Sequence, residues 1–159
     1  MAAQKGINSL VSLEEAETYF ADRLDAAAWI EADATAHAQA LVTATAYFDT
    51  MAWRGVITDL EQPLSFPRSG DYYDAKYGTS IILSGIPARI SKATFELAYH
   101  LLNNDGLLDV TGEVENFELG SIVMENIRSP EKLPHIVRAL VDPLRDRVTS
   151  GTRMVWRAN

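Results

Sequence analysis

Apolar side chains recur every three or four residues in two long segments, and this spacing predicts two long helices. The first helix follows Asp33, a residue type that caps helices, and is expected to end near residues 50–52. Its apolar stripe consists of His37, Leu41, Ala44, Phe48 and Met51. The second helix opens at Pro87, in the first helical turn, and ends at residues 103–106. It is apolar on two faces, which predicts a central helix with neighbours on both sides.

Three shorter helical pieces are expected around these two. Ser12 and Glu15 have the spacing of a capping box, which predicts a helix that continues to about Arg23. Residues 25–30 form a short helical turn. A last helix is expected over about residues 135–145, where Pro143 bends or shortens it.

Residues 53–70 do not read as a helix, because four glycines and prolines interrupt the stretch. The segment nevertheless contains Trp53, Leu64 and Phe66, which a fully solvated loop would not need. We therefore predict an ordered, partly extended connector whose aromatics hold it on the helices, with Arg68 left to contact another molecule. The alternative is that Trp53 and Phe66 only plug the core beneath a long loop. A tyrosine-rich loop follows, with a short strand at residues 80–83.

Residues 107–127 alternate loosely with a period of two, which predicts a β-hairpin or an extended arm. The expected fold class is mainly α: a small helical bundle with a long ordered loop, this hairpin or arm, and a C-terminal arm. The predicted core covers residues 1–102. Residues 103–159 hold the acidic extended region, the last helix and the basic arm, and the whole chain is expected to be one domain plus an arm.

Charge is distributed unevenly along the 159 residues, whose total is −8. Residues 1–102 carry a net charge of −6, residues 103–127 carry −6, and residues 128–159 carry +4. Only the last segment could supply a broad cationic footprint for nucleic acid. The asymmetry also suggests that acidic and basic surfaces meet between copies of the chain.

No catalytic, cofactor-binding or metal-binding pattern is found, and we predict that the chain is not an enzyme. There are no cysteines, and the three histidines are scattered without a partner at ligand spacing. No glycine-rich phosphate loop or serine nucleophile motif occurs. No apolar run is long enough for a membrane helix.

Aromatic and basic residues are interleaved at two places, a pattern that single-stranded nucleic acid can use. The first place combines Arg68 and Lys76 with Tyr72, Tyr73 and Tyr77, although Asp71 and Asp74 are expected to cancel most of its charge. The second combines Arg153 and Arg157 with Trp156 in the C-terminal arm. A docking arm explains the second group equally well.

Four segments in order resemble a known family. They are SLEEAETYFADR, LVTATAYFDTMAWRG, QPLSFPRSG and IPARISKATFELAYHLL, which together span about residues 9–103. They are similar to the opening helices, loop and central helix of tailed-phage head–tail connector proteins, also called adaptor or head-completion proteins. Part of that group carries the label DnaT-like single-stranded-DNA-binding protein.

The resemblance implies a structural virion protein: a ring of about a dozen copies between the portal and the tail or nozzle proteins. Genomic DNA would pass through its lumen without specific binding, and the protein would lie in the virion neck after assembly in the host cytoplasm. The residues expected to face a neighbouring subunit or the portal are Arg68, Tyr72, Tyr73, Tyr77, Arg153, Met154, Trp156 and Arg157. Two alternatives remain open, a single-stranded nucleic-acid-binding module and a helical interaction protein without a virion role.

Overall fold

The computed structural model describes residues 2–104, 116–119, 122–125 and 133–146. The helices are α1 Leu13–Ala21, α2 Ala27–Glu31, α3 Ala34–Asp49, α4 Ala88–Asn103 and α5 His135–Val141, followed by the 3-10 helix η1 Asp142–Leu144. The strands are β1 Val56–Ile57, β2 Arg68–Asp74, β3 Thr79–Leu83, β4 Asn116–Leu119 and β5 Ile122–Glu125. Helices make up close to half of the described residues, and a three-stranded antiparallel sheet accompanies them. The fold is therefore mixed α and β, and the expectation of a mainly α fold is only partly correct.

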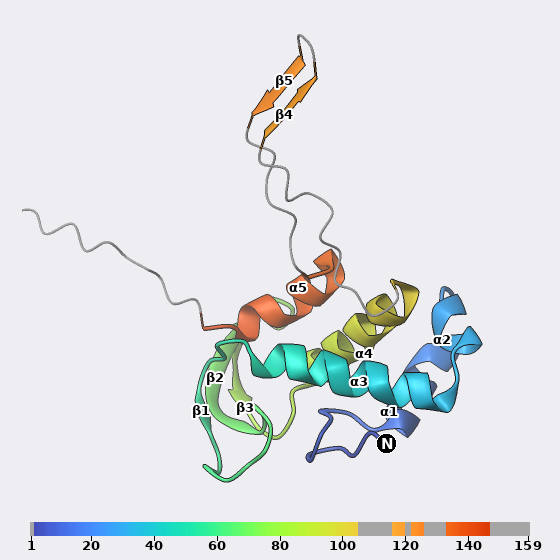
Figure 1. Ribbon diagram of the computed structural model, residues 1–159. Helices are drawn as coiled ribbons and strands as arrows, with labels where there is room; N and C mark the ends of the chain where they lie inside the picture. Colours follow the sequence, from blue (N-terminus) through green and yellow to red (C-terminus); the bar gives the residue numbers. More distant parts are fainter. Residues whose placement is uncertain (1, 105–115, 120–121, 126–132, 147–159) are drawn as a thin grey trace, which may run out of the picture.

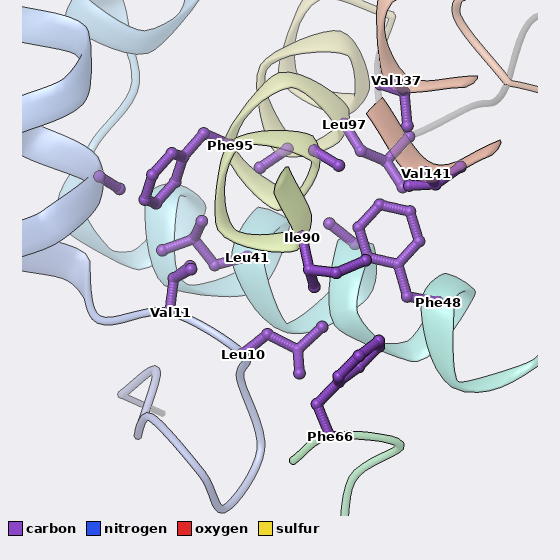
Figure 2. Close-up of a cluster of buried hydrophobic side chains, with 14 of the residues drawn as sticks. Leu10, Val11, Leu41, Phe48, Phe66, Ile90, Phe95, Leu97, Val137 and Val141 are labelled. Atoms are coloured by element: carbon purple, nitrogen blue, oxygen red, sulfur yellow. The ribbon is translucent and has the colours of Figure 1, made fainter. Parts of the chain in front are cut away.

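Helix α4 is the centre of the packing, as its two apolar faces predict. Helices α3 and α5 both pack against α4, α2 also contacts it, and the β1–β3 sheet lies at the far end of α3 from α1 and α2 (Figure 1). The core beneath these elements is built from large apolar side chains that are almost fully buried (Figure 2): Leu10, Val11, Leu41, Phe48, Phe66, Ile90, Phe95, Leu97, Val137 and Val141.

The helix ends follow the capping chemistry of the sequence. The Ser12 hydroxyl accepts a hydrogen bond from the Glu15 backbone N–H, and the Glu15 carboxylate accepts one from the Ser12 backbone N–H. Asp33 Oδ1 accepts a hydrogen bond from Ala36 N at 2.7 Å. Pro87 caps α4 rather than lying in its first turn. Helix α5 ends at Val141 and gives way to η1, which contains Pro143, as the sequence predicts.

The connector is ordered and held by its aromatics. Trp53 and Phe66 are buried with their ring centroids 5.2 Å apart in an edge-to-face arrangement, and Trp53 Nε1 donates a hydrogen bond to the Phe48 carbonyl at 2.8 Å. The two interpretations of the segment therefore describe one structure, since these rings both plug the core and fix the connector. Gly55 has φ of +73°, and a Cβ there would lie 2.3 Å from the Ser69 carbonyl oxygen, so the close approach of β1 to β2 requires glycine.

The tyrosine-rich stretch is a strand and not the expected loop. Strand β2 pairs antiparallel with β3, with Tyr72 opposite Ile81 and Tyr73 opposite Ser80. The strand predicted at residues 80–83 is confirmed and begins one residue earlier, at Thr79. Strand β1 adds to the other side of β2, where Val56 lies opposite Ser69.

The hairpin predicted within residues 107–127 is confirmed where the structure describes it, since β4 and β5 pair antiparallel. The rest of that acidic region and the C-terminal arm from residue 147 lie outside the described residues. Among the helices that the structure describes, none has the length and apolar character needed to span a membrane.

Candidate nucleic-acid interface

The β2–β3 hairpin has one face on the core and one face in solvent. Residues directly opposite one another in an antiparallel pair share a face, and neighbours along a strand alternate. Tyr72 and Leu83 are buried, which places Tyr72 and Ile81 on the inner face. Tyr73 is 57% exposed and Ile82 is 79% exposed, so the outer face presents an aromatic ring and an aliphatic side chain to solvent.

The turn of this hairpin, residues 75–78, adds a second ring and a cation. The backbone N–H groups of Tyr77 and Gly78 donate to the Asp74 carbonyl at 3.0 and 2.9 Å. Tyr77 is 61% exposed, and the Lys76 ammonium lies 5.1 Å from the centroid of its ring. We call Tyr73, Lys76, Tyr77 and Ile82 the hairpin outer face. Within residues 2–104, Tyr73 and Tyr77 are the only aromatic side chains more than half exposed.

A buried ion pair anchors the hairpin to α4. Asp74 is 2% exposed, and its carboxylate accepts hydrogen bonds from Arg89 Nε at 2.7 Å and Arg89 Nη2 at 2.5 Å. The Lys76 backbone N–H and the Tyr72 hydroxyl donate to the same carboxylate. The Arg89 guanidinium, helped by the Lys76 N–H, holds the pKa of Asp74 well below its usual range. Arg89 therefore neutralises Asp74. Of the two carboxylates expected to cancel most of the charge of this group, Asp71 is the one that remains exposed and unpaired with Arg89.

This ion pair predicts a pH dependence of stability. Because folding lowers the pKa of Asp74, its contribution to the free energy of unfolding is full above the ordinary carboxyl pKa, about 4, and is lost as the pH falls below it. We expect the Asp74→Asn variant to unfold at lower urea than the native chain at pH 7. The gap between the two urea midpoints should shrink steadily below pH 4. A gap that stayed constant down to pH 2 would show that the carboxylate charge is not what stabilises the hairpin.

Arg68 is used within its own chain. Its guanidinium donates to the carbonyls of Arg54 at 2.9 Å and Gly55 at 2.7 Å, and to those of Trp53 and Ser65 at 3.3 Å. Burial lowers the pKa of Arg68, yet the group remains cationic at any physiological pH. Arg68 is therefore not left free by the connector, because these bonds clamp the two ends of the connector together; its contact with a neighbouring molecule stays a prediction.

Tyr72 is likewise engaged within its own chain, because its ring is buried on the inner face. Its hydroxyl donates to Asp74 Oδ2 at 3.3 Å, and burial, followed by the Asp74 charge, raises the pKa of Tyr72. Of the first interleaved group, Tyr73, Lys76 and Tyr77 are exposed on one hairpin, and Lys76 lies over the ring of Tyr77. Arg153, Met154, Trp156 and Arg157 lie outside the described residues.

The other polar clusters tie helices together. Glu96 is buried and accepts hydrogen bonds from the Tyr19 hydroxyl at 2.5 Å and Arg23 Nη1 at 2.8 Å, which joins α1 to α4. Burial and the Glu96 carboxylate raise the pKa of Tyr19 to about 12. His37 stacks on Trp29 at a centroid distance of 4.0 Å, with Nε2 2.6 Å from the Trp29 carbonyl oxygen. Within the described ranges, no three His, Cys, Asp or Glu side chains gather to hold a metal ion.

Sequence reasoning missed two members of this arrangement. Ile82 belongs to the hairpin outer face. The sequence signal for it is the alternation of inward and outward side chains along β3, in which Ile82 lies between Ile81 and the buried Leu83. Arg89 is separated from Asp74 by 15 positions on a different element, a spacing that carries no sequence signal.

Comparison with known proteins identifies a family. A family model described as "Putative DnaT-like ssDNA binding protein" matches residues 2–157, nearly the whole chain. No curated protein and no solved structure matches the chain.

This match corrects the resemblance drawn from the four sequence segments. The family that matches is described as DnaT-like and single-stranded-DNA-binding, and no head–tail connector family is found, so the assignment as a connector is wrong, together with its virion, neck and portal-binding description. The chain belongs to the family of DnaT-like single-stranded-DNA-binding proteins.

Proposed function

We propose that the protein binds single-stranded DNA on the hairpin outer face. The observation that carries the proposal is the pairing of two exposed tyrosines, Tyr73 and Tyr77, with Lys76 between them in the sequence. Unpaired bases stack on exposed aromatic rings, and a nearby cation meets the phosphate backbone. Membership of a single-stranded-DNA-binding family supports the same function.

The hairpin is a rigid platform for such stacking. Tyr73 is the neighbour of Tyr72 and Asp74 along β2, and both of these side chains are buried and hydrogen-bonded. The turn that holds Tyr77 is fixed by two backbone hydrogen bonds to Asp74. The backbone that carries both rings is therefore fixed before DNA arrives, so little backbone entropy is lost when a base stacks on them.

Electrostatics at the site favour stacking over charge as the source of affinity. Lys76 is the one cation of the hairpin outer face, Asp71 lies on the same side of β2, and the chain as a whole carries a charge of −8. Duplex DNA has a higher density of phosphate charge than a single strand, but its bases are stacked on one another. A site with two rings and one cation should therefore select unpaired strands.

This reasoning predicts a weak salt dependence. A labelled 20-nucleotide single strand, titrated with protein and followed by fluorescence anisotropy, should bind more tightly than the matching duplex. The slope of log K against log salt concentration should be shallow, about −0.7 to −1.4, which corresponds to one or two phosphate contacts on a single strand. Lys76→Ala should flatten this slope, and Lys92→Ala, which removes an exposed lysine of α4, serves as the control.

Two outcomes would contradict the proposal. Equal affinity for the duplex and the single strand would mean that base stacking is not the basis of binding. A slope steeper than about −3 would place binding on a broader cationic surface than the hairpin outer face. Assembly of several copies, location in the host cytoplasm and the absence of catalysis stay predictions.

A further inference from the structure

Strand β3 forms an edge of the three-stranded sheet and lacks the usual protection of an edge. The order is β1-β2-β3, so the side of β3 away from β2 has no strand beside it among the described residues. Its sequence, Thr79–Leu83, contains no charged residue and no proline, and Ile82 is strongly exposed. Natural proteins usually protect such edges with a lysine, a proline or a very short strand, because the unpaired N–H and C=O groups of an edge can pair with another strand.

The opposite edge of the same sheet is protected. Strand β1 has only two residues, Val56 and Ile57, and the exposed Arg54 lies just before it. The contrast matters because both edges belong to one small sheet. Of the two edge strands of this sheet, β1 is protected and β3 is not.

We propose that β3 pairs with β3 of a second copy of this chain, antiparallel and about a twofold axis. The two three-stranded sheets then join into one six-stranded sheet. Full overlap of the two strands places Ile81 on the axis and Ile82 opposite the partner's Ser80. Because the strand is uncharged, no like charges meet across the axis, and the two Ile82 side chains lie on the diagonal, where aliphatic groups still contact each other.

The pairing has a consequence for DNA, and this part rests on the proposed function. Directly opposed residues share a face, so the hairpin outer faces of both copies lie on the same side of the joined sheet. The two strands run in opposite directions, which puts the two Lys76–Tyr77 turns at opposite ends. A single strand that crosses the dimer therefore meets two aromatic sites, and binding at the first raises the effective concentration at the second.

The test is the mass of the full-length protein in solution, measured without DNA by light scattering after size exclusion. The native protein is expected to have the mass of two chains at tens of micromolar, and Ile82→Lys that of one chain. Val56→Lys, which places the same charge on an exposed residue of the β1 edge, should keep the mass of two. A native mass of one chain, or an Ile82→Lys variant with the same mass as Val56→Lys, would overturn the proposal.

A covalent readout tests the register and does not depend on the behaviour of the lysine variant. The chain has no cysteine, so Ser80→Cys combined with Ile82→Cys introduces the only two thiols. In the proposed register the thiol at position 80 of each chain faces the thiol at position 82 of the other, at the separation that a disulfide needs. Oxidation should therefore yield a dimer linked between chains. Monomer after oxidation would contradict the register.

The DNA measurements separate this proposal from the proposed function. If the native protein is dimeric but binds no single-stranded DNA, the pairing stands and the DNA function fails. If DNA binds to a native protein that is monomeric at every concentration, the function stands and the pairing fails.

Discussion

Replacing Tyr73 and Tyr77 together with alanine is expected to lower the affinity for single-stranded DNA at least about thirty-fold. Base stacking on an aromatic side chain contributes about 1–3 kcal/mol per base, and about 2 kcal/mol for the pair corresponds to that loss. Both rings are mainly exposed, and neither packs in the core, so the free energy of unfolding should change little. Fluorescence anisotropy with the labelled single strand measures the first effect, and urea unfolding the second.

The control for this pair is replacement of both tyrosines with phenylalanine. Phenylalanine keeps the ring and removes only the hydroxyl, so affinity should remain within a few-fold of the native value. If the double phenylalanine variant lost as much affinity as the double alanine variant, hydroxyl hydrogen bonds and not stacking would hold the DNA. Native affinity in the double alanine variant would place the binding surface on another part of the chain.

The helices could be predicted because their signals are local. The stripe from His37 to Met51 and the capping residues Ser12 and Asp33 are each complete within a few turns of sequence, and α1 and α3 begin where those residues indicate. A helix that buries one face repeats its signal every turn. That repetition is why α3 and α4 were placed to within a few residues.

Strand β2 could not be predicted, because its signal depends on partners far along the chain. In Arg68–Asp74 the buried positions are Tyr72 and Asp74, and an aspartate does not look like a core residue. It becomes one through Arg89, which approaches from α4. The strand forms because β3 pairs with its backbone and Arg89 of α4 neutralises Asp74. Neither partner lies within the seven residues of the strand itself.

The candidate site was therefore found only in part. Interleaved tyrosines and cations pointed to residues 68–77, but a one-residue change of register exchanges the two faces of a strand. The sequence alone could not show that Tyr73 faces solvent while Tyr72 faces the core. The bonds of Arg68 within its own chain were missed for a related reason: the four carbonyls that accept them come together only when the connector folds.

Replacing Phe66 with alanine is expected to have the largest effect on stability, about 3–5 kcal/mol, the usual cost of deleting a buried phenylalanine. Phe66 is 2% exposed and packs edge-to-face on Trp53, and Figure 2 shows its ring among Leu10, Ile90 and Phe48. The cavity left behind lies where the connector meets the helices, so the surroundings can collapse only partly. Urea unfolding followed by tryptophan fluorescence measures the change.

Leu60→Ala is the matched control, because Leu60 belongs to the same connector but is 90% exposed. It should unfold within about 0.5 kcal/mol of the native protein. A loss below about 1 kcal/mol for Phe66→Ala would show that the connector does not depend on its aromatics. DNA binding tests whether the effects on stability and on affinity are separate. At temperatures where Phe66→Ala is still folded, its affinity for the single strand should equal the native value. The hairpin has its own anchor to α4 in the ion pair of Asp74 and Arg89, so Phe66→Ala should lower stability while the tyrosine variants lower DNA binding.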